Sequence, residues 1–222
     1  MSKDATDILC IVDRSGSMST IKDDAIGGFN SFLEGQKKEP GDARMTLVQF
    51  DNEYEEVFVG KNITEVPPYT SDTYVPRGTT ALFDAVGKSV TMLSERRMKI
   101  NEEERPNKVI CVIITDGHEN SSREYNGEAV KRLIDEKKRL SWEFIFVAAG
   151  MDQCVAENIG AGMGVGVNNI FSVSHTARGM NAAYNSIGNA VLSYRSSGSI
   201  GDNWRSESEE IQSKKGKIRR YT

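Results

Sequence analysis

The sequence predicts an α/β fold: a doubly wound, mostly parallel sheet with one antiparallel edge strand and helices on both faces. Three short apolar runs lack the apolar–polar alternation of a half-exposed strand, so both faces of each run are expected to be buried. Segments with a helical period separate the runs, and alternating strands and helices are typical of a doubly wound sheet. The runs are Ile8 to Val12, Val109 to Ile114 and Phe144 to Ala149.

Four stretches are predicted to be helices. In each of them apolar residues recur every three or four positions and form a stripe that can pack against a sheet. The stripes are Met18, Ile21, Ala25, Phe29 and Phe32; Leu82, Val86, Val90 and Leu93; Ala129, Val130, Leu133 and Ile134; and Met180, Tyr184, Ile187, Val191 and Tyr194.

The antiparallel strand is expected to come from a hairpin. Met45 to Phe50 and Tyr54 to Val59 both resemble strands, and Asp51 and Asn52 lie near their junction. Asp and Asn tolerate the positive φ angles that tight hairpin turns require. A further run, Asn169 to Val173, is expected to supply the last strand of the sheet.

Three other stretches are interpreted as connections or as a tail. Glu95 to Pro106 carries charges of both signs and ends in proline, which indicates a helix end and a surface connection. The glycines from Gly160 to Gly166 lack the spacing of a nucleotide-binding loop and are interpreted as a flexible connection. Residues 196–222 are rich in Ser, Gly and charge, so we expect a mobile tail after one domain over residues 1–195.

Composition narrows the range of functions. A net charge of -4 over 222 residues gives no general electrostatic reason for nucleic acid to bind. The three cysteines are scattered, which favours a reducing compartment over a disulfide framework. The N-terminal residues lack signal-peptide character, and no run approaches the roughly 18 apolar residues of a membrane span. We therefore expect a cytoplasmic protein without a membrane partner, and its oligomeric state stays open.

Oxygen-bearing side chains cluster at three places where a helix is about to begin. Asp13, Ser15 and Ser17 follow the first buried strand on alternate residues, and Thr115-Asp116-Gly117 follows the strand at residues 109–114. In a doubly wound sheet both sets lie at the carboxyl edge, where such folds bind ligands. Between them in sequence, Arg77-Gly78-Thr79-Thr80 precedes the second helix and offers another hydroxyl.

The pattern of these residue types indicates a site for a divalent cation. At a single junction, Ser, Thr or Asp is more often a helix cap than a metal ligand. Three such junctions at one edge are much harder to explain as caps. Carboxylate and hydroxyl oxygens are hard donors, which suit Mg²⁺ or Mn²⁺ and not zinc.

These motifs together closely resemble those of the von Willebrand factor A domain, whose fold is Rossmann-like. The resemblance rests on Asp13-x-Ser15-x-Ser17, Gly78-Thr79-Thr80-Ala81-Leu82 and Thr115-Asp116-Gly117, and it covers about residues 7–195. Within the family, the sequence most resembles the small, stand-alone intracellular members of bacteria and phages. In that family these elements form the metal-ion-dependent adhesion site.

The resemblance implies a set of metal-binding positions. The matching residues are Asp13, Ser15, Ser17, Thr80 and Asp116. The family usually has Gly-Gly-Thr in the middle motif, so Thr79 replaces a glycine here, and its effect on the loop is left open. The resemblance also implies that Mg²⁺ (or Mn²⁺) keeps one open coordination position for an Asp or Glu of a protein partner. The lack of an evident general base predicts that the chain is not an enzyme.

Parts of the sequence are compatible with two other functions. A metal-dependent hydrolase of phosphate esters also uses carboxylates at a sheet edge, but position 15 is a serine and no general base is evident. The basic residues at 214–220 would suit a nucleic-acid-associated accessory protein, but acidic residues precede them, which favours a solubilising tail. Arg14, Arg77 and His118 adjoin the metal motifs and are expected to form a rim that contacts an acidic partner.

Overall fold

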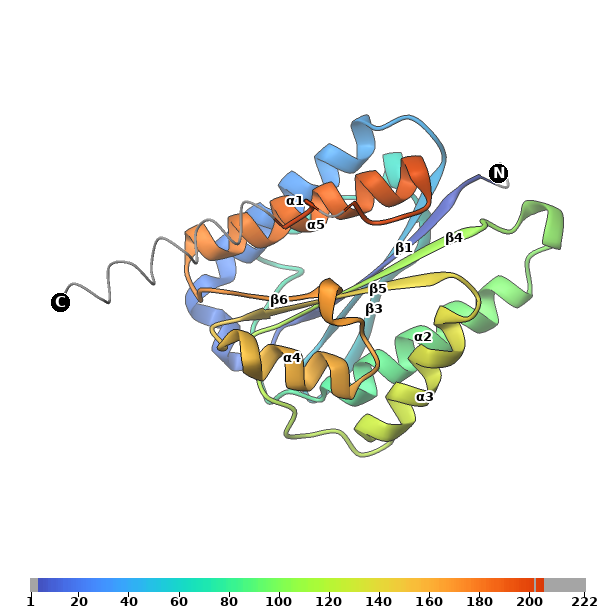
Figure 1. Cartoon of the computed structure of the whole chain (residues 1–222). Helices are drawn as coiled ribbons and strands as arrows, with labels where there is room; N and C mark the ends of the chain where they lie inside the picture. Colours follow the sequence, from blue (N-terminus) through green and yellow to red (C-terminus); the bar gives the residue numbers. More distant parts are fainter. Residues whose placement is uncertain (1–3, 202, 206–222) are drawn as a thin grey trace.

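The computed structural model describes residues 4–201 and 203–205 and contains a six-stranded sheet with the strand order β3-β2-β1-β4-β5-β6 (Figure 1). All neighbouring strands are parallel except β2 and β3, which are antiparallel. The strands are β1 (Thr6–Asp13), β2 (Ala43–Phe50), β3 (Tyr54–Asn62), β4 (Lys108–Thr115), β5 (Trp142–Ala149) and β6 (Ile170–Val173). The predicted doubly wound sheet with an antiparallel edge strand is confirmed.

Helices cover both faces of the sheet. Figure 1 shows α1 and α5 on one face, and α2, α3 and α4 on the other. The α-helices are α1 (Lys22–Lys38), α2 (Leu82–Met98), α3 (Gly127–Lys138), α4 (Gln153–Gly162) and α5 (Ala177–Ser197). Short 3₁₀ helices are η1 (Gly16–Ile21), η2 (Ile63–Glu65), η3 (Glu102–Glu104) and η4 (Val167–Asn169). The four predicted helical stripes all lie in this set, and the connection predicted at 95–106 contains the end of α2 and η3.

The central strands bury both of their faces, as their continuous apolar runs predict. Every residue of β1 is buried. Ile8 belongs to the hydrophobic core on the side of α1 and α5, whereas its neighbour Leu9 belongs to the core on the side of α2 and α3. The parallel register pairs Val12 with Ile114, so β1 and β4 reach the carboxyl edge together. This register fixes the position of the site.

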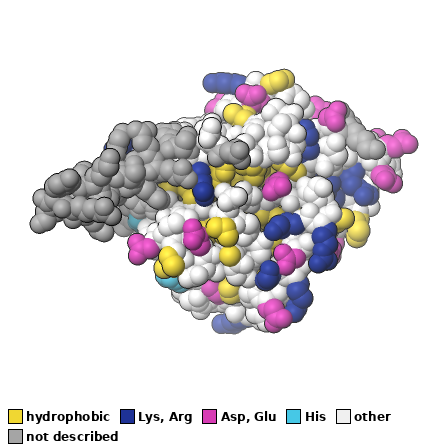
Figure 2. Space-filling model, in the orientation of Figure 1, with side chains coloured by type: hydrophobic (Ala, Val, Ile, Leu, Met, Phe, Trp, Pro, Cys, Tyr) yellow, Lys and Arg dark blue, Asp and Glu magenta, His cyan; other side chains and the backbone are white. Residues whose placement is uncertain are grey.

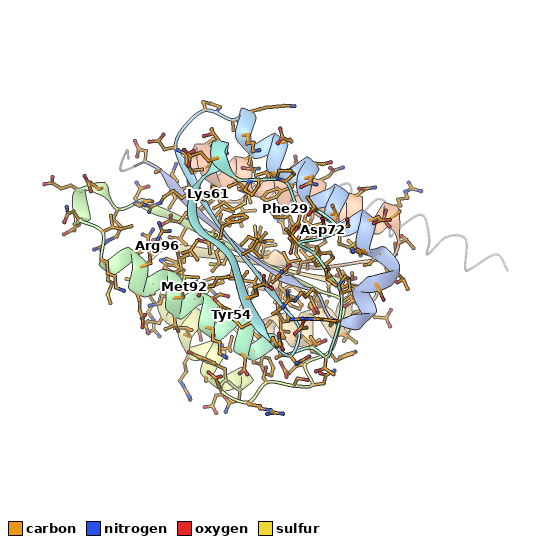
Figure 3. The ribbon with its side chains drawn as sticks, turned by 180° about the vertical axis from the view of Figure 1, so that it is seen from behind. Phe29, Tyr54, Lys61, Asp72, Met92 and Arg96 are labelled. Carbon is orange, nitrogen blue, oxygen red and sulfur yellow. The ribbon has the colours of Figure 1, made fainter. Side chains whose placement is uncertain are left out.

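The hairpin of β2 and β3 forms one edge of the sheet. Asp51 closes its turn, because Asp51 Oδ1 accepts a hydrogen bond from the Glu53 amide at 2.6 Å and the Asp51 amide donates to the Glu53 carbonyl at 3.0 Å. Figure 3 shows β3 between α2 and α1, with Tyr54 and Lys61 toward its two ends. At Gly60, where φ is 56°, the Arg96 guanidinium occupies the space that a side chain would fill. Only glycine suits both the conformation and this contact.

The flexible connection predicted from Gly160 to Gly166 is wrong at its start, where the structure contains the end of helix α4. The first glycines of that segment, Gly160 and Gly162, lie in the last turn of α4 rather than in a loop. Gly160 is the residue that packs on the sheet: an added Cβ would lie 2.7 Å from Ile170 Cδ1 and 3.0 Å from Phe146 Cδ1. The buried face of α4 consists of Ala156 and Gly160. Such small residues produce no apolar stripe, which is why the helical period is not visible in the sequence.

The folded part of the described chain extends past residue 195. Helix α5 runs through Ser197, so the predicted domain boundary falls inside a helix. Trp204 is 6% exposed and belongs to the core on the α1 and α5 side. Its ring packs edge-on against Phe171 of β6 at a centroid distance of 5.0 Å. The basic residues at 214–220 lie outside the described residues.

Candidate metal centre

Three loops meet at the carboxyl edge of the sheet. Asp13 and Thr115 are the last residues of β1 and β4, which pair side by side. Two backbone hydrogen bonds attach the loop before α2 to the loop after β1. The Gly16 amide donates to the Gly78 carbonyl at 3.2 Å, and the Arg77 amide donates to the Arg14 carbonyl at 2.8 Å. The three motifs predicted to form one site are therefore brought together.

The centre of the site is a triangle of side-chain oxygens. Ser17 Oγ donates to Asp116 Oδ1 at 2.8 Å, Ser15 Oγ lies 3.1 Å from Ser17 Oγ, and Ser15 Oγ lies 3.4 Å from Asp116 Oδ1. In an octahedral Mg²⁺ shell with metal–oxygen distances of about 2.1 Å, adjacent ligand oxygens are about 3 Å apart. The three separations fit one face of such a shell, so the residues fit the metal that the motifs imply.

Asp13 supplies a buried negative charge beside this triangle. Its side chain accepts hydrogen bonds from the Ser15 amide at 2.6 Å and from Thr115 Oγ1 at 2.5 Å, one on each carboxylate oxygen. The pKa of Asp13 is raised to about 6, mainly by burial and to a smaller extent by the charge of Asp116, while the hydrogen bonds from Thr115 and Ser15 oppose the rise. A carboxylate in this position is costly to ionise without a cation nearby, and a divalent ion would remove that cost.

Thr80 reaches the site from the loop before α2. It is 3% exposed, and its amide donates to Asn120 Oδ1 at 2.9 Å while its carbonyl accepts from the Asn120 amide at 3.0 Å. Its hydroxyl lies against Gly117, where an added Cβ would be 2.5 Å from Thr80 Oγ1. The glycine after Asp116 therefore leaves room for the Thr80 hydroxyl beside the Thr115-Asp116-Gly117 motif. The exposed neighbour, Thr79, accepts a hydrogen bond from Ser121 Oγ at 2.5 Å instead.

The three predicted rim residues have different environments. Arg14 is a correction: it is 4% exposed, and its guanidinium pairs with Asp51 at 2.9 Å and with Glu55, so it faces the hairpin and not a partner. Arg77 is half-exposed, and it pairs with Asp51 at 2.9 Å. His118 is exposed and makes no hydrogen bond or ion pair within the described part of the chain.

His175 is the site residue that sequence reasoning missed. It lies between β6 and α5, and its Nε2 is 2.8 Å from Asp116 Oδ2. The contact joins residues 59 positions apart in sequence, and no motif at residue 175 signals it. The only available signal was topological, because the end of β6 lies at the same edge of the sheet as the ends of β1 and β4.

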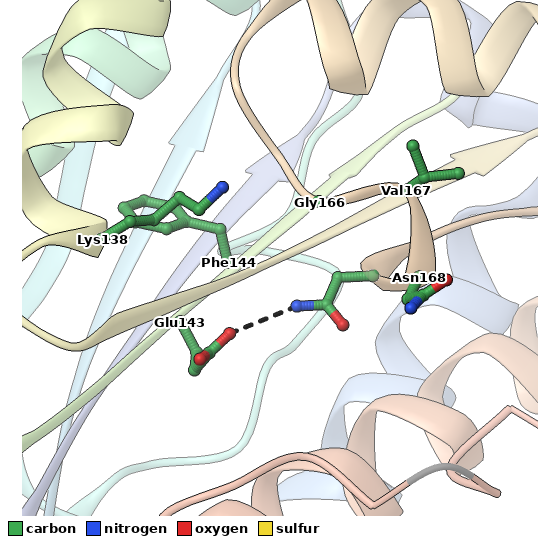
Figure 4. Close-up of a pocket in the computed structure, with 7 residues that line it drawn as sticks. Lys138, Glu143, Phe144, Gly166, Val167 and Asn168 are labelled. Atoms are coloured by element: carbon green, nitrogen blue, oxygen red, sulfur yellow. Dashed lines mark hydrogen bonds between the residues drawn. The ribbon is translucent and has the colours of Figure 1, made fainter.

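A separate cavity lies at the opposite edge of the sheet. Figure 4 shows its lining, in which Glu143 at the start of β5 accepts a hydrogen bond from Asn169 at 3.3 Å. The cavity has a volume of about 370 Å³.

Among the described residues, no group of three or more His, Cys, Asp or Glu side chains is arranged to hold a metal ion. The candidate centre is of another kind, because most of its donors are hydroxyls.

The fold and the edge site define a Rossmann-like domain that carries the three-part motif of a metal-ion-dependent adhesion site. The sequence model of the von Willebrand factor type A domain family matches residues 7–154 of this chain. The chain belongs to this family. A comparison with curated protein sequences finds no match.

Several solved structures share the fold at low sequence identity. The von Willebrand domain of the pilus tip protein Mfa5 from Porphyromonas gingivalis has a TM-score of 0.63 at 10% identity, over 89% of this chain and 98% of that one. The pilus adhesin SpaC from Lactobacillus rhamnosus GG has a TM-score of 0.60 at 15% identity, over 85% and 30%. Proximal thread matrix protein 1 of the mussel byssus, solved with a zinc-occupied MIDAS motif, has a TM-score of 0.56 at 13% identity, over 85% and 46%. This chain thus spans less than half of the mussel protein.

Proposed function

We propose that this protein is a divalent-metal-dependent module that binds the Asp or Glu side chain of a protein partner. The metal is Mg²⁺ or Mn²⁺, and the residues that hold it are Asp13, Ser15, Ser17, Thr80 and Asp116. The observation that carries the proposal is the triangle of Ser15, Ser17 and Asp116 oxygens, with separations of 2.8 to 3.4 Å. The zinc-occupied motif of the mussel protein supports metal binding by this fold.

The charge balance of the site favours an acidic partner. Only one carboxylate oxygen, Asp116 Oδ1, lies within the triangle. Both oxygens of Asp13 already accept hydrogen bonds from the chain, so Asp13 acts mainly through its charge. The hydroxyl donors are neutral, and a carboxylate in the open coordination position would add the negative charge that the direct ligands lack.

We further propose that the module binds without catalysing a reaction. A hydrolase of phosphate esters needs a base or a second direct carboxylate near the ion. His118 is exposed and makes no hydrogen bond within the described residues, and the Nε2 atom of His175 is already paired with Asp116. The prediction is that purified protein with Mg²⁺ does not hydrolyse p-nitrophenyl phosphate, and turnover that disappears in Asp13→Ala would favour the hydrolase.

Nucleic acid is a weaker candidate partner. Figure 2 shows acidic and basic side chains interspersed over the face that it displays, whereas phosphate recognition calls for a continuous basic surface.

Within the described residues, no helix is long and apolar enough to span a bilayer. A cytoplasmic location remains part of the proposal, and the three free cysteines, Cys10, Cys111 and Cys154, support it.

The proposal is tested with a peptide that carries a single glutamate and with the same peptide carrying glutamine. With millimolar Mg²⁺, the full chain should bind the glutamate peptide, and the glutamine peptide should bind at least several-fold more weakly, because a neutral amide compensates the ion poorly. Chelator should abolish the difference and added Mg²⁺ should restore it. Thr80→Ala should weaken peptide binding while part of the metal affinity remains. Equal binding of both peptides in chelator and in Mg²⁺ contradicts the proposal.

A further inference from the structure

His175 connects the β6–α5 loop to the metal centre through one carboxylate. Its Nε2 lies 2.8 Å from Asp116 Oδ2, while Asp116 Oδ1 belongs to the triangle with Ser15 and Ser17. The two oxygens of Asp116 therefore have different partners on opposite sides. The Asp116 side chain is 1% exposed, and the His175 side chain is 28% exposed. The imidazole thus covers the outer oxygen of a buried carboxylate.

Two further groups, Gly150 and Thr20, lie close to His175. An added Cβ on Gly150, which has φ of 77° at the end of β5, would lie 3.1 Å from His175 Cβ. On the ring's other nitrogen, Thr20 Oγ1 of η1 lies 3.5 Å from Nδ1. A carboxylate oxygen only accepts hydrogen bonds, so the hydrogen between His175 and Asp116 is on Nε2. The ring is placed to donate to Asp116.

We propose that His175 is a positioning residue that limits Asp116 to one metal-bound oxygen and so makes the site selective for Mg²⁺ and Mn²⁺ over Ca²⁺. The inference rests on the proposed metal site. Mg²⁺ requires near-octahedral coordination, whereas Ca²⁺ takes six to eight oxygens and often binds both oxygens of a carboxylate. With Oδ2 bonded to His175, Asp116 offers only Oδ1. Removing the imidazole frees the second oxygen and permits the wider shell.

Calorimetric titration of the full chain with Mg²⁺, Mn²⁺ and Ca²⁺ tests this role in three variants. His175→Ala should weaken Mg²⁺ and Mn²⁺ binding by about tenfold, the scale on which hydrogen-bond partners of metal ligands act, and should weaken Ca²⁺ binding much less. His175→Gln restores an N–H donor for Asp116 Oδ2 and should recover most of the selectivity. Leu140→Ala is the control, because Leu140 is 63% exposed and precedes β5, at the end of the sheet away from the site, and it should leave all three affinities unchanged.

The ratio of Ca²⁺ to Mg²⁺ dissociation constants is the decisive readout, because a general loss of structure lowers both affinities together. The same ratio in wild type and His175→Ala overturns the selectivity role, even if both affinities fall. Wild-type protein that binds none of the ions overturns the proposed metal site as well. Nitrogen-15 spectra of the imidazole provide a test in unmutated protein. The His175 Nε2–H signal should persist when Mg²⁺ is added, and its loss would show that the ion breaks the contact with Asp116 and would overturn the role.

Discussion

At the scale of single residues, the two carboxylates of the site have unequal roles. Asp13 is enclosed by the Ser15 amide and Thr115, and burial raises its pKa. Asp116 links the hydroxyls to His175. One carboxylate supplies charge from behind the site and the other supplies a direct oxygen. The metal-free site therefore stores electrostatic strain at Asp13, which a cation relieves.

This arrangement predicts a dependence of stability on pH in the metal-free protein. The pKa of Asp13 is raised from 3.8 to about 6, so the folded state binds the proton more tightly than the unfolded state does. The contribution of Asp13 to the free energy of unfolding is therefore greatest at acidic pH and decreases as pH rises from about 4 to about 6. Denaturant unfolding of wild type in chelator should show this decrease relative to Asp13→Asn, and Mg²⁺ should reduce it. Parallel pH profiles for the two proteins in chelator would contradict the prediction.

The residues of the site were predictable to the extent that they follow strand ends. Asp13 and Asp116 follow apolar runs, and the carboxyl ends of parallel strands lie at one edge of the sheet, so the sequence predicts that edge for both. That they meet there depends on β1 and β4 being neighbours. The partners of Arg14 are not predictable in this way, because its contacts with Asp51 and Glu55 depend on how the hairpin turn folds back over the first loop. His175 likewise depends on the path of a loop that carries no pattern.

At the scale of elements, the strands and helices that could be predicted from the sequence are those that pack through large apolar side chains. Strands β1, β4 and β5 are runs of large apolar residues, and the helices α1, α2 and α5 have clear stripes. Helix α4 packs through Ala156 and Gly160, and small residues on a contact face look like a loop in the sequence. The small residues allow α4 to approach the sheet closely, and Ile159 and Ala161 also pack against the core on this side.

The close approach predicts opposite outcomes for two glycines of one helix. Gly160→Val should reduce the free energy of unfolding by about 1–3 kcal/mol, because the added atoms overpack a contact in which a Cβ alone would lie 2.7 Å from Ile170. Gly162→Val should change it by less than about 0.5 kcal/mol, because an added Cβ there has nothing within 4 Å. Urea unfolding of both variants measures the difference. Equal effects at the two positions would mean that α4 does not pack as described.

At the scale of the whole molecule, the two sheet faces are closed by different parts of the chain. The core on the side of α1 and α5 includes Trp204, which lies beyond the end of α5 and packs on Phe171 of β6. Arg205 Nη1 also donates to the Ile170 carbonyl at 3.1 Å. The polar composition of residues 196–222 led to the expectation of a tail. Within the described part of that segment, Trp204 joins the chain to the core, because it buries a large apolar area.

Trp204→Ala should therefore destabilise the domain by about 3–5 kcal/mol, the range for truncating a buried aromatic side chain. Leu140→Ala is the matched control, since Leu140 is 63% exposed, and it should change the free energy of unfolding by less than about 0.5 kcal/mol. Thermal and urea unfolding of the full chain measure both. A Trp204→Ala variant as stable as wild type would place the domain boundary back near residue 195.

Calorimetric titration of Mg²⁺ into the wild-type chain, Asp13→Ala and Asp116→Ala tests the central claim most directly. The wild type should bind one ion, and both variants should remain folded and lose that binding, because each loses one of the two negative charges of the site. Asp152→Ala serves as the control, since Asp152 precedes α4 at the same edge of the sheet and is outside the proposed ligand set. One-to-one binding in wild type that disappears in both site variants and persists in the control is the predicted result. Binding of unchanged affinity in Asp116→Ala would contradict the account, because the oxygen triangle would not be the metal site.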